Sequence, residues 1–245
     1  MEISLKEFFF LLIVLISNII QTITGFAGTV LAMPASIALL GYEVAKPILT
    51  FIVIPASIVL VISNFKAINF KKFIFMLAFV GVGFIFGYLI SLINLDSKLL
   101  LIIYGSIICL IAIGYMFFNF DKIQVSNISG ALILILAGIL HYLYTSGGPL
   151  VIIYALSNFK EKKEFRGTLS LMWIILNSIL FVEDIVGGFY IEHNIFLTIY
   201  ALTISIASIL IGILLEKKIN QKVFVRITYV LLFISGLISI LTNIF

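Results

Sequence analysis

One stretch of sequence decides how this chain folds: QTITGFAGTVLAMP, residues 21–34. It interrupts an apolar run over residues 8–42, which is too long for one membrane crossing of about 20 residues. Glycine adds backbone freedom and proline removes a hydrogen-bond donor, so both weaken a continuous helix. The stretch therefore predicts that one helix ends here, within the membrane, and that a second helix begins.

A second break of the same kind lies further along the chain. The sequence TSGGP, residues 145–149, interrupts the apolar run 127–157. The other apolar segments lie at residues 48–63, 73–93, 99–118, 168–182, 195–214 and 223–244. The segments 48–63 and 168–182 are short and must extend into their flanks to span a bilayer. These eight segments, the first and fifth broken or re-entrant, predict an all-α polytopic integral membrane protein.

The composition agrees with this fold class. Of 245 residues, 63% are hydrophobic and 11% are charged, against roughly half and a quarter in soluble domains. The net charge of +4 is dispersed and forms no basic stripe, so we expect the lipid bilayer as a partner and no nucleic acid. The single Cys109 has no second thiol for a disulfide or a metal site, and neither a cofactor nor a metal is predicted.

The two breaks belong to an internal repeat. An offset of 120 residues aligns the chain with itself without a gap. The matched positions include Gly28 and Gly148, Lys46 and Arg166, Lys98 and Lys218, and the small-residue pairs Gly83-xxx-Gly87 and Thr203-xxx-Ala207. We therefore predict a single membrane domain, 1–245, built from two homologous halves, 1–122 and 123–245.

The positions of the basic residues orient the halves, because cytoplasmic loops carry an excess of Lys and Arg. If each long segment crosses once, ten basic residues lie on one side and five on the other. If each broken segment returns to the side it entered, the distribution becomes twelve to three. The stronger bias favours re-entrant segments, inverted halves and two chain ends that face outside. Many secondary transporters place their substrate site between such discontinuous helices near the midplane.

The breaks predict an anion site. A helix N-terminus offers unpaired N–H groups and about half a positive charge, so helices that begin at Gly28 and Gly148 would attract an anion. No lysine or arginine falls within either break, so neutral donors are expected to hold the ion and to release it. The predicted substrate-binding residues are Gln21, Thr22, Thr24, Gly25, Gly28, Thr145, Ser146, Gly147 and Gly148.

Five further residues are candidates for the pathway or for coupling. Lys46 and Arg166 could attract anions to the two mouths of the pathway or serve only as topology anchors. His141 is the ionisable side chain deepest in a long segment, and a proton role is one possibility. Asn177 could line the pathway or bond to a neighbouring helix, and Thr168 lies in a hydroxyl-rich segment after Arg166.

At these residues the chain resembles the sulfite exporter TauE/SafE family, whose members have two related halves that each open with a glycine-rich break. The motifs are Gly25-Phe26-Ala27-Gly28 through Met33-Pro34, Thr145-Ser146-Gly147-Gly148-Pro149-Leu150, and Arg166-Gly167-Thr168-Leu169-Ser170 opposite Lys46-Pro47-Ile48-Leu49-Thr50. The resemblance implies a secondary transporter of sulfite, organosulfonates or related small organic anions, an exporter or an uptake permease, in a prokaryotic cytoplasmic membrane. It implies neither a cofactor nor ATP hydrolysis, and so no enzyme.

Several alternatives stay open at this point. Transport could be passive, as in an anion channel, or coupled to a proton or sodium ion, and the protein could be a monomer or a homodimer. An intramembrane hydrolase would need Ser146 and His193 within hydrogen-bond reach of each other. A subunit of a larger membrane complex would have little need of interrupted helices inside the bilayer.

Overall fold

The computed structural model describes residues 3–93, 96–117, 125–216 and 221–244, and these form ten α-helices, one 3-10 helix and no strand. The helices are α1 (Leu5–Thr24), α2 (Gly28–Leu40), α3 (Tyr42–Asn64), η1 (Phe65–Ala67), α4 (Phe70–Leu92), α5 (Ser97–Phe117), α6 (Asn127–Tyr144), α7 (Gly148–Asn158), α8 (Lys162–Val186), α9 (Glu192–Glu216) and α10 (Gln221–Ile244). All except α2, α7 and η1 are long and apolar enough to cross a membrane, which makes eight candidate spans. The predicted fold class, an all-helical multi-pass membrane protein, is confirmed.

Two helix ends follow from local backbone conformation. After α1, Gly25 adopts a φ of +89°, the left-handed conformation that glycine reaches without strain and that commonly ends a helix. After α6, Thr145 adopts a φ of +52°, which costs a residue with a Cβ roughly 1–2 kcal/mol. A new helix begins three residues later in both places, α2 at Gly28 and α7 at Gly148.

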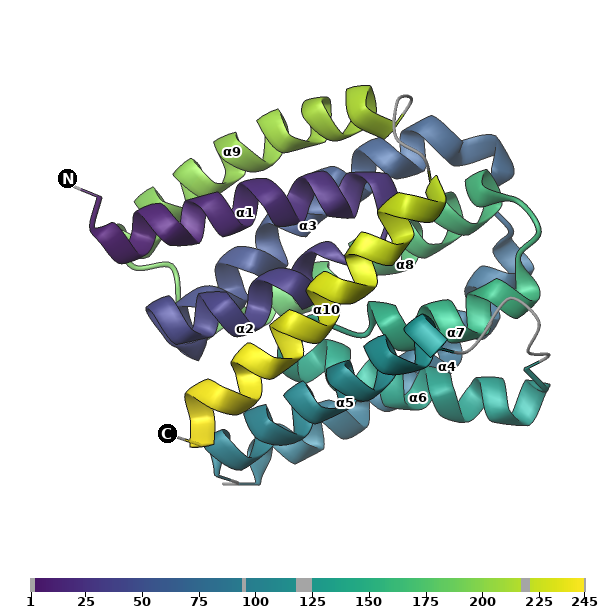
Figure 1. Cartoon of the computed structure of the whole chain (residues 1–245), viewed down its shortest axis with the longest axis horizontal. Helices are drawn as coiled ribbons and strands as arrows, with labels where there is room; N and C mark the ends of the chain where they lie inside the picture. The colour runs from purple at the N-terminus through teal and green to yellow at the C-terminus, as the bar shows by residue number, and fades with distance from the viewer. Residues whose placement is uncertain (1–2, 94–95, 118–124, 217–220, 245) are drawn as a thin grey trace.

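The helices pack in pairs. The central helices α3 and α8 contact each other, α1 contacts α9, α4 contacts α6, and α5 contacts α10. Helix α2 lies between α1, α3 and α10 (Figure 1). The segments 48–63 and 168–182 do extend into their flanks, as predicted, because α3 begins at Tyr42 and α8 at Lys162. The start of α1 and the end of α10 lie at the same end of the molecule, on the left in Figure 1.

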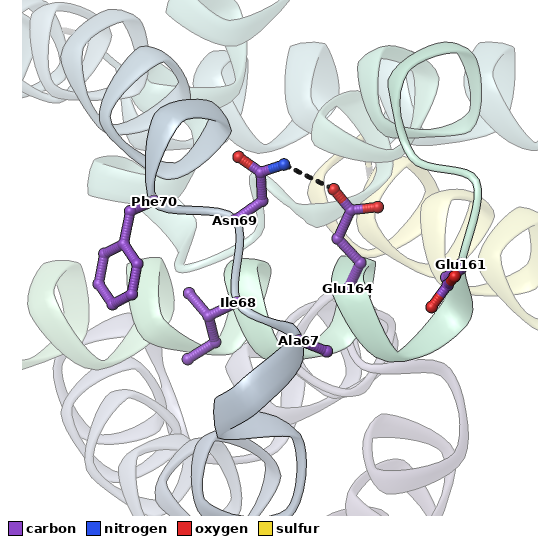
Figure 2. A pocket seen from close by; sticks show the side chains of 6 residues that line it. All are labelled: Ala67, Ile68, Asn69, Phe70, Glu161 and Glu164. Carbon is purple, nitrogen blue, oxygen red and sulfur yellow. Dashed lines mark hydrogen bonds between the residues drawn. The ribbon is translucent and has the colours of Figure 1, made fainter.

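Polar contacts tie the helices together at the two ends of α3. At its beginning, the hydroxyl of Tyr190 donates to the carbonyl oxygen of Pro47 over 3.2 Å. Beyond its other end, the Lys72 ammonium lies 2.8 Å from Oε1 of Glu164 and donates to the carbonyl oxygen of Asn158 over 2.6 Å. Figure 2 shows that Glu164 also accepts from Asn69, beside an open groove lined by the chain between η1 and α4 and by the start of α8.

Small residues allow α4 and α6 to approach closely. A Cβ atom on Gly83 would lie 1.8 Å from the carbonyl oxygen of Ile135, and a Cβ on Gly138 would lie 2.1 Å from that of Val80. Contacts this short show that the two backbones touch, the arrangement that small-xxx-small motifs permit in membranes. The pair that begins at Gly83 therefore serves helix packing in this structure.

We expect Gly83→Val to lower the free energy of unfolding by about 1–3 kcal/mol, because the added side-chain atoms must separate α4 from α6. The measurement is the melting temperature of the purified protein in detergent. Gly81→Val is the matched control on the same helix, since nothing lies within 4 Å of a Cβ at Gly81. Equal melting temperatures for the two variants would contradict the packing argument.

Candidate functional site

The ends of α1 and α6 and the starts of α2 and α7 meet in the interior. The hydroxyl of Thr29 donates to the carbonyl oxygen of Thr145 over 2.8 Å, and the hydroxyls of Thr50 and Thr145 lie 3.0 Å apart. A Cβ atom on Gly148 would lie 2.7 Å from the carbonyl oxygen of Phe26. The two glycine-rich breaks, about 120 residues apart in sequence, are therefore in direct contact.

A small cavity lies where the breaks meet. Its volume of about 10 Å³ is roughly the space for one water molecule. Its lining comes from both halves and consists of Gln21, Phe26, Thr29, Val53, His141, Thr145, Gly148, Trp173 and Asn177. Five of the residues predicted from sequence are thus brought together in one place, namely Gln21, His141, Thr145, Gly148 and Asn177.

Four lining residues were not predicted: Phe26, Thr29, Val53 and Trp173. The predicted repeat could have indicated two of them, because Val53 and Trp173 are 120 residues apart, the same offset that separates the two breaks. Phe26 and Thr29 lie inside the first break, but their side chains gave no reason to choose them. Their position in the cavity depends on the turn between α1 and α2.

Side chains of α1 cap the N-terminus of α2. The backbone N–H of Gly28 donates to Oε1 of Gln21 over 2.7 Å. The N–H groups of Phe26 and Ala27 donate to the hydroxyl of Thr24 over 3.3 and 3.2 Å. The backbone N–H groups of Phe26, Ala27 and Gly28 therefore already have acceptors within the protein, which leaves fewer N–H groups for an anion at the start of α2.

The start of α7 is arranged differently. The N-cap residue of α7 is Gly147, which has no side chain that could cap the helix, and Pro149 in the first turn has no N–H group. The nearby hydroxyl of Ser146 donates to the carbonyl oxygen of Tyr144 and accepts from the Tyr104 hydroxyl over 2.7 Å, so it faces α5. A Cβ atom on Gly147 would lie 2.4 Å from the carbonyl oxygen of Ala137, which explains the need for glycine at this position. The start of α7 borders the cavity, because Gly148 is one of the lining residues.

Two polar side chains in the cavity lack partners. Both ring nitrogens of His141 and the Oδ1 atom of Asn177 have no hydrogen bond within the part of the chain that the structure describes. His141 is only 2% exposed and stacks on Trp173 with ring centroids 4.6 Å apart. Buried polar atoms nearly always have partners, so these unsatisfied atoms indicate a site for something else.

The two equivalent basic residues lie beside the breaks and are buried, not at open mouths. The guanidinium of Arg166 donates to the carbonyl oxygen of Thr22, near the end of α1. The ammonium of Lys46 lies over the ring of Tyr142, 5.0 Å from its centroid. This differs from the expectation that no fixed cation stands at the breaks, because each side chain reaches across to the opposite half.

The remaining predicted residues lie outside the cavity lining. The hydroxyl of Thr22 donates to the carbonyl oxygen of Asn18 within α1, and its side chain packs against Gly212 of α9. The hydroxyl of Thr168 accepts from the backbone N–H of Asn69 over 3.0 Å, near the groove of Figure 2. Gly25 supplies the positive φ that ends α1.

The structure does not bring Ser146 and His193 together. Nε2 of His193 lies 2.7 Å from Oε1 of Glu7 at the beginning of α1, whereas the hydroxyl of Ser146 bonds to Tyr104 in the interior. A serine nucleophile needs a base within hydrogen-bond reach. This geometry therefore gives no support to the intramembrane hydrolase.

Comparison with known proteins places the chain in a family. The family model described as sulfite exporter TauE/SafE matches residues 9–238, which is nearly the whole chain. The chain belongs to the sulfite exporter TauE/SafE family. Membership in this transporter family implies transport of sulfite or related anions across a membrane. No curated protein and no solved structure matches this TauE/SafE protein.

Capping of α2 by Gln21 leads to a test of stability. We expect Gln21→Leu to lower the free energy of unfolding by about 1–3 kcal/mol, because the buried N–H of Gly28 loses its acceptor. The melting temperature in detergent measures the effect. Gln21→Glu keeps an oxygen acceptor at the same distance along the side chain and should retain most of the stability. If the melting temperature of the leucine variant is not lower than that of the glutamate variant, the hydrogen bond from Gly28 to Gln21 does not stabilise the protein.

Proposed function

We propose that this protein is a secondary transporter that carries sulfite, an organosulfonate or a related small organic anion across the cell membrane of a prokaryote. The observation that carries the proposal is the buried cavity at the uncapped N-terminus of α7, where His141 and Asn177 have unpartnered atoms. The anion would bind there, between the two breaks. Family membership supports the class of substrate.

The binding site is proposed to be asymmetric. The start of α7 offers free N–H groups and the positive end of a helix dipole, which suit an oxyanion. The start of α2 serves instead as a wall of the site, because Gln21 and Thr24 occupy its N–H groups. Lys46 and Arg166 are close enough to the breaks to add positive potential without standing in the cavity lining.

We further propose that the halves form an inverted repeat. The helix pairings support it. The offset of 120 residues matches α4 with α9 and α1 with α6, and α4 contacts α6 just as α9 contacts α1. The same offset matches α3 with α8 and α5 with α10, and the two helices of each of these pairs contact each other. The cross-contacts of Arg166 with Thr22 and of Lys46 with Tyr142 are related in the same way. The boundary at 122–123, Lys122 and Lys218 lie outside the described residues.

The proposed repeat includes re-entrant segments. Glu7 near the start of α1 bonds to His193, and Pro47 near the start of α3 bonds to Tyr190, only three residues earlier in the chain. These contacts support a chain that returns, through α2, to the end from which α1 started. In the second half, a Cβ on Gly130 of α6 would lie 2.8 Å from the ring of Tyr154 of α7, which supports the same path.

The cavity volume also bears on the transport cycle. About 10 Å³ is too small for any sulfur oxyanion, so the site must enlarge before it can accept one. Alternating access would supply that change, with one half moving against the other around the site. An enlargement of the cavity is therefore part of the proposed cycle.

Transport should depend on the close contact of the breaks. We expect reconstituted protein to take up radiolabelled sulfite or sulfoacetate saturably, and Gly148→Ala to reduce the rate about tenfold or more, because the added methyl group meets the carbonyl oxygen of Phe26. Gly81→Ala is the control, since open space surrounds that position. Flux that grows linearly with anion concentration would indicate a channel, and no flux above empty liposomes would refute the proposal.

The re-entrant arrangement can be tested by labelling. In a Cys109→Ser background, single cysteines would replace Ile3, Lys71 and Ile191, which are all exposed. We expect a membrane-impermeant maleimide to reach positions 3 and 191 from one side of the membrane and position 71 from the other. Labelling of positions 3 and 71 from the same side would instead indicate that each long segment crosses the membrane once.

A further inference from the structure

We propose that His141 binds a proton together with the transported anion, so that the protein is an anion–proton symporter. This inference rests on the proposed function, since it concerns the same cavity. It begins from a difference between the halves: the offset of 120 residues that aligns the breaks places His141 where the first half has Gln21. The two side chains line the same cavity.

In the first half, Gln21 at this position caps the start of α2. Its amide oxygen accepts from the N–H of Gly28, so the first half closes its own helix start with a neutral group that cannot change charge near neutral pH. His141 lies close to the start of α7, because a Cβ on Gly147 would be 3.0 Å from the Cβ of His141. Yet neither ring nitrogen has a partner among the described residues. The second half therefore has a titratable group where the first half has a permanent cap.

The surroundings of His141 make a lone imidazolium unfavourable. It is 2% exposed, and its ring stacks on Trp173 of α8 and lies 6.3 Å from the ring of Phe84 of α4. The lining contributed by the other helices is uncharged, and Lys46 of α3 is the charged group that acts on His141 electrostatically. A second positive charge in such a place has no counter-charge, which is costly in a buried site.

An anion in the cavity would supply the counter-charge that the His141 imidazolium lacks. The imidazolium N–H would donate a charge-assisted hydrogen bond to an anion oxygen, while N–H groups at the start of α7 would bind the same anion. The unpartnered Oδ1 of Asn177 can accept from the second N–H of the ring. The bound proton thus raises the affinity for the anion, and the bound anion raises the affinity for the proton to the same degree.

The proposed cycle moves one proton with each anion. A proton from the solution on one side adds to a free ring nitrogen of His141 when the anion enters the cavity. After the site opens to the other side, the anion leaves, and the imidazolium loses its counter-charge and releases the proton. No bond within the anion is made or broken, and His141 returns to its neutral form.

Binding at different pH values tests the inference. The probe is methanesulfonate, which stays fully ionised, titrated calorimetrically into purified protein in detergent between about pH 5 and 8. We expect the affinity to fall by up to about tenfold per pH unit as pH rises, with one proton taken up per anion bound. His141→Gln, which installs the residue of the first half, should bind with no pH dependence. His193→Gln is the matched control, because the other histidine of the chain lies at the start of α9, and it should keep the slope.

Transport supplies a second readout. In proteoliposomes that contain a pH-sensitive dye, methanesulfonate uptake by the unmodified protein and by His193→Gln should acidify the lumen, whereas residual uptake by His141→Gln should not. Binding or uptake without proton movement in the unmodified protein would overturn the inference and leave the proposed function intact, even if His141→Gln failed to fold. Proton movement that persists in His141→Gln would also overturn it. Neither binding nor uptake of methanesulfonate, sulfite or sulfoacetate would overturn both.

Discussion

The interior ends of α1 and α6 impose the main constraint on this molecule. A helix that ends in the interior of a protein leaves backbone N–H and C=O groups where water does not reach them, and each group left unsatisfied costs free energy. The protein meets this requirement with side chains from the opposite half as well as from neighbouring turns. Arg166 bonds to the carbonyl oxygen of Thr22, Tyr42 to that of Leu143, and Thr29 to that of Thr145.

The two breaks share hydrogen-bond partners across the structure. Arg166 reaches the first break from the second half of the chain, and Tyr42 reaches the second break from the first half. The same contacts bring the starts of α2 and α7 together around one cavity. Backbone hydrogen bonding thus places the groups that hold the anion, in the proposed function, between the two breaks.

Within this shared architecture, small differences give the halves different chemistry. The position before the break is a capping amide in the first half and an unpartnered imidazole in the second. The basic residues matched by the predicted repeat also differ: the guanidinium of Arg166 donates to the carbonyl oxygen of Thr22, whereas the Lys46 ammonium lies over aromatic rings. In the proposed function, the first half therefore caps the start of its short helix, and the second half leaves that place to the anion.

The sequence by itself determined the helical class, the eight apolar segments and the positions of the two breaks, because hydropathy, glycine and proline act over a few residues. It also indicated Gln21, His141 and Asn177, since polar groups inside apolar segments are conspicuous. Only the tertiary structure decided which hydroxyls reach the cavity: Thr22 bonds within its own helix, whereas Thr29 contacts the opposite break. That choice depends on how two segments about 120 residues apart approach each other, and no local pattern records it.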